Sequence, residues 1–211
     1  MLMSELSLEA TLHDVKIGDR QFHIVRLSRP LVGTLTDIGH YYGEVDEQSF
    51  WTVTVAWALA ARSAHSIIYV PSTKTASPIE SLELILVHHG QQLSASGWKR
   101  IRNKLGRGKP TRIHLPIEAF DPVRLRGTGY RPGRHFRENK DVLRWTAAGR
   151  TVMVTGSRIA FEDDIRQLVV NAEQNFDELP DEGWMKVCVE IGNSQTDFHL
   201  HPLQGAASSG Q

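Results

Sequence analysis

The chain has a single cysteine, no long apolar stretch and no basic leader, and each absence narrows its class. Cys188 is the only cysteine among 211 residues, so no internal disulfide can form and a reducing compartment is favoured. The longest apolar run, around residues 50–61, is shorter than the roughly 18 to 20 residues that a membrane-spanning helix requires. Residues 1–9 carry two glutamates where a secretory leader would be positive. We therefore expect a cytoplasmic protein without a membrane segment.

The chain also lacks net charge, but its charges are distributed unevenly. It contains 24 basic and 24 acidic residues. Residues 98–140 hold thirteen of the basic residues and three of the acidic ones, Glu118, Asp121 and Glu138. The thirteen are Lys99, Arg100, Arg102, Lys104, Arg107, Lys109, Arg112, Arg124, Arg126, Arg131, Arg134, Arg137 and Lys140. Both flanks are accordingly acidic, and this asymmetry is the strongest functional signal in the sequence.

Length and pattern predict an α+β fold. The composition suits one globular domain over residues 1–203, followed by a flexible polar tail over residues 204–211. Apolar runs separated by turn residues predict hairpins over residues 10–27, 151–161 and 185–200. Together with three to four helices, these hairpins predict a mixed or antiparallel sheet built largely from hairpins, with a long basic loop.

Apolar spacing predicts where the larger helices lie. Residues 31–39 are expected to form a short helix, followed by a loop over residues 40–45. Asp46 is a suitable cap for a helix that runs to about residue 64 and is apolar around most of its circumference. We expect it to be the central core helix. A further amphipathic helix is predicted over residues 162–176.

Residues 82–116 are predicted to form a central strand, a turn, a short basic helix and a return strand. Ser94 or Ser96 is expected to cap this helix. At about 100° per residue, Trp98, Ile101 and Leu105 fall on one side of it. Its cations fan over the other side, so one face is predicted to pack and the other to be positively charged.

A long loop over residues 124–140 follows, in which arginines alternate with glycines and aromatic residues. Guanidinium groups pair with phosphates, and aromatic rings stack on unpaired bases. The sequence therefore predicts non-enzymatic binding of nucleic acid or another polyanion by the basic helix and this loop. The predicted contacts are Lys99, Arg100, Lys104, Arg107, Lys109, Arg124, Arg126, Tyr130, Arg131, Arg134, Phe136 and Arg137.

The basic segment also suits two different roles. In the first, the protein is a structural or inhibitory subunit of a protein assembly, and the basic segment contacts acidic segments such as residues 162–164 or 177–182 of a neighbour or a second copy. In the second, the basic segment is an ordinary solvated surface.

Histidines supply a third functional hypothesis, a metal-dependent nuclease. His88 and His89 end the predicted central strand, and His199 and His201 project from one face of the last strand. If these strand ends met, the imidazoles and Asp197 would suit a divalent metal. The sequence contains no nucleophile elbow, and Val154 to Arg158 lacks the glycines and lysine of a phosphate-binding loop. We therefore expect a binding protein without a cofactor.

Overall fold

The computed structural model describes residues 5–37, 41–73, 81–116, 120, 141–176, 189–191 and 198–202, and the fold of these residues is α+β. The helices are α1 (Glu47–Arg62), α2 (Ala95–Arg102) and α4 (Arg158–Phe176), with a 3-10 turn η1 (His89–Gln91). The strands are β1 (Glu5–Ile17), β2 (Arg20–Leu27), β3 (Gly33–Asp37), β4 (Tyr41–Val45), β5 (Ser66–Val70), β6 (Glu83–His88), β7 (Lys109–Pro116), β8 (Arg144–Ala148), β9 (Thr151–Gly156), β10 (Val189–Ile191) and β11 (Phe198–Pro202).

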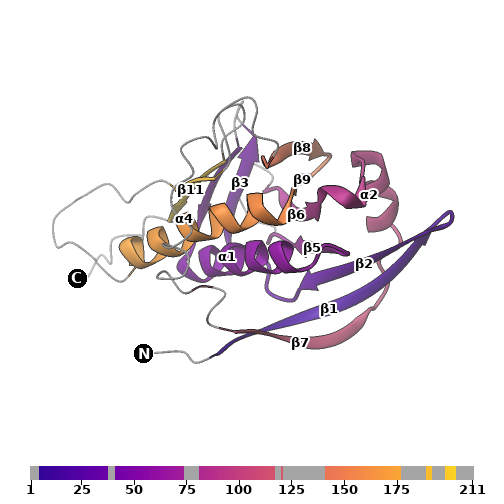
Figure 1. The fold of residues 1–211 in the computed structure, drawn as a ribbon, viewed down its shortest axis with the longest axis horizontal. Helices are drawn as coiled ribbons and strands as arrows, with labels where there is room; N and C mark the ends of the chain where they lie inside the picture. The colour runs from indigo at the N-terminus through magenta and orange to yellow at the C-terminus, as the bar shows by residue number, and fades with distance from the viewer. Residues whose placement is uncertain are drawn as a thin grey trace, which may run out of the picture.

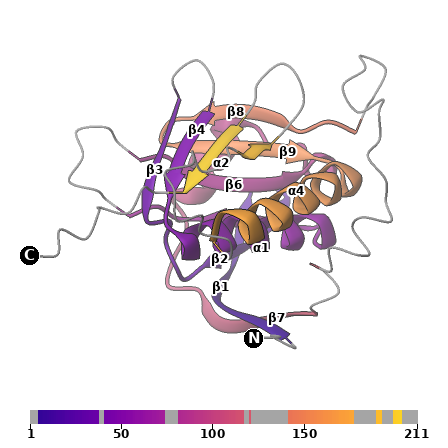
Figure 2. The ribbon, with the colours of Figure 1, turned by 90° about the vertical axis from the view of Figure 1, so that its left-hand side faces the viewer.

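The strands form two mixed sheets. The larger has the order β7-β1-β2-β5-β6-β9-β8, in which β2 and β5 are parallel, as are β6 and β9. The smaller has the order β10-β11-β4-β3, with β11 and β4 parallel. Helices α1 and α4 lie side by side over one face of the larger sheet, whereas α2 covers the other face (Figures 1 and 2). We refer to the latter as the α2 face.

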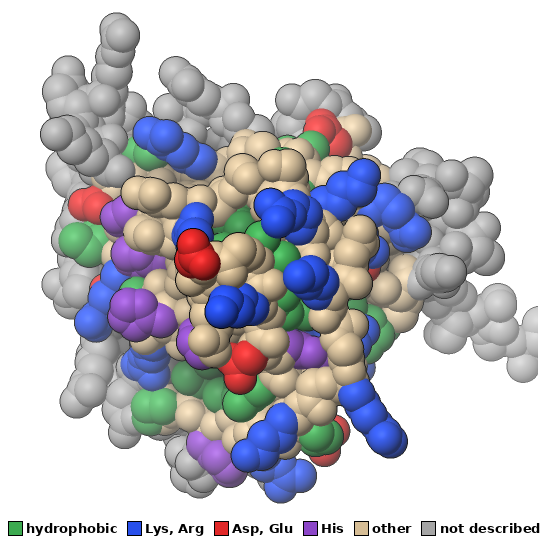
Figure 3. All heavy atoms as spheres, turned by 90° about the vertical axis from the view of Figure 1, so that its right-hand side faces the viewer, with side chains coloured by type: hydrophobic (Ala, Val, Ile, Leu, Met, Phe, Trp, Pro, Cys, Tyr) green, Lys and Arg blue, Asp and Glu red, His purple; other side chains and the backbone are tan. Residues whose placement is uncertain are grey.

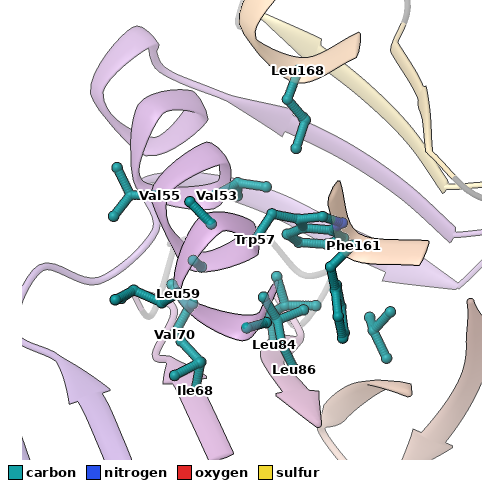
Figure 4. Packing of buried hydrophobic residues seen from close by; sticks show 14 of the residues in the cluster. Val53, Val55, Trp57, Leu59, Ile68, Val70, Leu84, Leu86, Phe161 and Leu168 are labelled. Atoms are coloured by element: carbon teal, nitrogen blue, oxygen red, sulfur yellow. The ribbon is translucent and has the colours of Figure 1, made fainter. Parts of the chain in front are cut away.

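Helix α1 lies at the centre of the main core, as the sequence predicts. The Asp46 carboxylate accepts a hydrogen bond from the Ser49 amide at 2.7 Å and caps the helix. Trp57 is fully buried, and its ring meets that of Phe161 from α4 edge-on with centroids 6.3 Å apart (Figure 4). Leu84 of β6 lies beneath the Trp57 ring (Figure 4). Helix α1 is buried on nearly all sides, which explains why its sequence is apolar around most of the helix circumference.

The predicted hairpin over residues 10–27 is confirmed. β1 and β2 pair from Ala10 opposite Leu27 to Ile17 opposite Arg20. Gly18 has a φ of 61° in the turn, where a glycine is favoured. β1 extends further toward the N-terminus than expected, because its first half pairs with β7 on its other side.

The short helix predicted over residues 31–39 is wrong, and so is the loop predicted at 40–45. These residues contain β3 and β4, which form a hairpin in the smaller sheet. Gly33 has a φ of 135°, and a Cβ at this position would overlap the carbonyl oxygen of Glu44. Burial alternates along β3, and β4 pairs with β11. Both features favour an extended backbone here, although the apolar residues are spaced as in a helix.

The predicted pairing of residues 151–155 with residues 158–161 is also wrong. β9 instead pairs with the preceding strand, β8. Residues 158–161 begin α4, because the Ser157 hydroxyl accepts a hydrogen bond from the Ala160 amide at 3.1 Å and starts the helix. β10 and β11 pair antiparallel within the last predicted hairpin, whose residues 185–188 and 192–197 lie outside the described residues. Residues 124–140 and the tail at 204–211 lie outside the described residues. Within the described ranges, no helix is both long and apolar enough to cross a bilayer.

Candidate functional site

Helix α2 is anchored to the sheet by its apolar side, as predicted. The Ser94 hydroxyl accepts from the Gly97 amide at 3.1 Å and caps the helix. Trp98 is 1% exposed and Ile101 is fully buried, and both pack on a second apolar cluster that includes Tyr69 of β5. The rings of Tyr69 and Trp98 meet edge-on with centroids 5.2 Å apart. The helix ends at Arg102.

A polar network next to this contact fixes the end of α2. Arg102 Nη2 donates to Glu83 Oε1 at 3.0 Å, and the Thr151 hydroxyl donates to Glu83 Oε2 at 3.3 Å. Trp98 Nε1 donates to the same hydroxyl at 3.1 Å. Burial, followed by the charge and hydrogen bond of Glu83, raises the pKa of Tyr69 to about 12, so its phenol stays protonated. Arg102 therefore has a structural partner and is not a free cation.

The remaining cations around α2 differ from Arg102. Lys99, Arg100, Arg107 and Lys109 are exposed, and no ion pair or hydrogen bond engages their side chains within the described part of the chain. Lys104 Nζ donates to the Lys16 carbonyl at 3.2 Å, which positions the ammonium group without neutralising it. We call these five residues the basic surface. All five are contacts that the sequence predicts, and they follow one another from the outer side of α2 into β7.

Strand β2 adds two cations that the sequence did not indicate. Arg20, Phe22, Ile24 and Arg26 are every second residue of β2, so their side chains share one face of the strand. Phe22 and Ile24 belong to the apolar cluster beneath α2, and this face is therefore the α2 face. The Arg20 guanidinium lies 4.9 Å from the centroid of the Phe22 ring and donates to the Gln91 carbonyl. Arg26 lies 5.7 Å from the ring of Tyr69. Figure 3 shows Lys and Arg side chains spread over this side of the molecule, with histidines beside them.

The remaining predicted contacts lie outside the described residues. They are Arg124, Arg126, Tyr130, Arg131, Arg134, Phe136 and Arg137.

The four histidines considered as metal ligands lie in different sheets. His88 and His89 are at the carboxyl end of β6, with ring centroids 4.5 Å apart, whereas His199 and His201 belong to β11. Burial and then the charge of His199 lower the pKa of His201, which Glu44 partly opposes. Among the described residues, no group of three or more His, Cys, Asp or Glu side chains is arranged to hold a metal ion.

One of the acidic segments considered for assembly is largely occupied by contacts of its own. Glu162 accepts from Arg158 Nε at 2.7 Å, and Asp164 is 1% exposed. Asp164 is therefore inaccessible to a neighbouring molecule, whereas Glu162 belongs to an exposed pair. Residues 177–182 lie outside the described part of the chain.

Comparison with known proteins gives no relative from which to assign a role. No protein-family model, curated protein or solved structure matches this chain.

Proposed function

We propose that the protein binds nucleic acid without sequence preference, through phosphate contacts of the basic surface. The observation that carries the proposal is that Lys99, Arg100, Arg107 and Lys109 are exposed and unpaired among the described residues, whereas Arg102 on the same side of the sheet is paired with Glu83. Phosphate oxygens are the partners that Lys and Arg most often bind on nucleic acids. Contacts of this kind position a backbone and do not read bases.

The cations contribute little to the packing of α2, which supports a role in binding. Trp98 and Ile101 attach the helix to the sheet, and Arg102 ties its end to β6. The cations instead repel one another across a short element, which costs free energy in the unbound protein. A bound polyanion relieves this repulsion and releases its counterions, which favours association.

The test is charge reversal of Arg100 and Lys104. The probe is a fluorescent single-stranded oligonucleotide of about 20 nucleotides, long enough to cover one binding surface. Binding is followed by anisotropy at several salt concentrations. We expect Arg100→Glu with Lys104→Glu to abolish binding and to leave the melting temperature unchanged.

A matched control reverses the same number of charges elsewhere. Arg29 and Arg62 are exposed and lie outside α2 and the segment that follows it. Arg29→Glu with Arg62→Glu should retain most of the affinity, because net charge alone acts weakly over distances beyond the Debye length of about 10 Å. Equal affinity in the α2 double variant and in the parent protein would show that the basic surface is not the site.

A further inference from the structure

The carboxyl ends of β6 and β9 mark a point where the chain departs in opposite directions. The two strands are parallel neighbours, and His88 lies opposite Gly156 at their ends. From β6 the chain continues into α2 on one face of the sheet, and from β9 it continues into α4 on the other. In open sheets, ligands bind outside the carboxyl ends of strands at such points.

Four imidazoles lie at this end of the sheet: those of His88, His89 and His65 around the end of β6, and that of His23 on β2, which is paired with Asp14. His88 is partly exposed and its ring stacks on that of exposed His89, with an interplanar angle of 31°. His65, which precedes β5, is close enough to act electrostatically on His88. Gln91 Nε2 donates to the Ala64 carbonyl at 3.0 Å and so ties η1 to the segment that carries His65.

Further charges at this edge come from two more segments. Arg20 of β2 donates to the Gln91 carbonyl, so a permanent cation lies beside η1. The connection from β9 to α4 contributes pairs that are already formed: the Ser157 hydroxyl donates to Asp141 at 2.8 Å, and Arg158 donates to Glu162. The Asp141 carboxylate keeps its negative charge, so attraction for an anionic ligand at this end of the sheet comes from Arg20 and from the imidazoles.

We propose that the carboxyl end of β6 is a phosphate-binding subsite of the nucleic-acid surface, in which the imidazoles of His88 and His89 bind phosphate oxygens with His65 and Arg20 beside them. His88 Nδ1 already accepts a hydrogen bond from the Gly90 amide at 3.2 Å, so Nε2 is the nitrogen left for phosphate. The inference rests on the proposed function and extends it. Arg20 lies on the α2 face and adjoins η1, whereas His88 is on the face of Leu84 and Leu86, so a bound strand would pass from the basic surface by Arg20 and around the end of β6 to reach the histidines. The subsite takes the phosphate group of a nucleotide chain and requires no metal.

The subsite makes binding depend on protons. Burial and then the charges of His89 and His65 lower the pKa of His88 in the free protein. A bound phosphate stabilises the charged form of His88 and raises its pKa, so binding takes up a proton. As the pH falls toward 6, His88 in the complex exchanges its Nδ1 hydrogen bond from Gly90 for a proton, and affinity rises by up to about tenfold per pH unit for the proton taken up.

The experiment compares binding of the same oligonucleotide at about pH 8 and pH 6, on either side of the ordinary histidine pKa, at constant ionic strength. We expect the parent protein to bind at least about tenfold more tightly at the lower pH. His88→Gln with His89→Gln should lose this increase, so that its affinities at the two pH values are similar. The control, His114→Gln, removes an exposed imidazole from β7 at the far edge of the larger sheet and should retain the increase.

A second measurement uses the unmutated protein and does not depend on how the variants fold. The imidazole proton resonances of His88 are titrated by NMR with and without the oligonucleotide, and the pKa of His88 should rise on binding. One outcome overturns the subsite alone: the protein binds at pH 8 in a manner that depends on Arg100 and Lys104, but His88 and His89 make no difference to the affinity at pH 6. Absence of binding at both pH values overturns the proposed function as well.

Discussion

The guanidinium of Arg102 lies 3.0 Å from the carboxylate of Glu83, and this ion pair joins the last turn of α2 to the first residue of β6. Glu83 is 9% exposed and also accepts from the Thr151 hydroxyl. Arg102 therefore stabilises the fold, unlike the exposed cations next to it, which have no such partner among the described residues.

Arg102→Met should lower the free energy of unfolding by about 2 kcal/mol, because it leaves the mostly buried Glu83 carboxylate without its charged partner. Urea denaturation measures the change. The control is Arg112→Met, which removes the exposed pair with Glu9 at 3.7 Å and should cost about 0.5 kcal/mol or less. Equal losses in the two variants would contradict a structural role for the Arg102 pair.

Neutralising an exposed cation of the basic surface should change the salt dependence of nucleic-acid binding more than neutralising a paired one. Each phosphate contact contributes about −0.7 to the slope of log affinity against log salt for single strands. Lys99→Gln should therefore reduce the magnitude of this slope by about 0.7. Arg112→Gln should change it less, since Glu9 already offsets the charge of Arg112. Identical slopes for Lys99→Gln and the parent protein would remove Lys99 from the surface.

Two glycines with positive φ should respond differently to alanine. Gly33→Ala places a Cβ against the Glu44 backbone and should prevent β3 from pairing with β4, at a cost of several kcal/mol. Gly149 has a φ of 65° in the turn between β8 and β9, with open space around it. Gly149→Ala should cost only about 1 kcal/mol of backbone strain. Thermal unfolding of the two variants provides the comparison, and a mild effect at Gly33 would argue against the observed pairing.

Acidification should destabilise the protein partly through His13. This side chain is 6% exposed, its Nε2 has no hydrogen-bond partner among the described residues, and burial followed by the charge of Arg26 lowers its pKa. The unfolded chain binds a proton more readily, so stability is fully present above the unfolded pKa of about 6.5 and declines as the pH falls toward the folded pKa.

The corresponding measurement is urea unfolding at about pH 7.5 and pH 5.5, above and below the unfolded pKa. His13→Phe should lose less stability between these conditions than the parent protein does. The difference between the two losses is the quantity to compare, because the substitution also changes packing against Gly108. A loss as steep in His13→Phe as in the parent would show that different groups control the acid response.

The sequence correctly predicts those helices and strands whose formation depends on signals within a short stretch of the chain, such as a capping residue or the spacing of apolar side chains. Asp46 caps α1, Ser94, one of the two predicted candidates, caps α2, and β6 is a central strand of the larger sheet, each as expected. The sequence also correctly predicts which side of α2 packs on the sheet and which side carries the cations. These features rest on side-chain spacing and on hydrogen bonds within one turn, which a single stretch of sequence contains.

The errors arise where partners distant in sequence determine the structure. Leu31 and Leu35 have helical spacing, yet β3 forms because β4 is held by β11 at the other end of the chain. The pairing of Arg102 with Glu83 and the position of Arg20 beside η1 likewise depend on tertiary contacts. The sequence therefore identifies the cations near α2, but not that Arg102 is paired or that β2 contributes further cations.

Strand β1 pairs with β2, which follows it directly, and with β7, in which Pro116 lies opposite Glu5. During synthesis the β1–β2 hairpin leaves the ribosome long before β5 and β7 exist to cover its two outer edges. Unpaired edges are templates for association with other chains. Pauses in translation between residues 27 and 109 therefore prolong the interval in which the nascent chain is prone to aggregation.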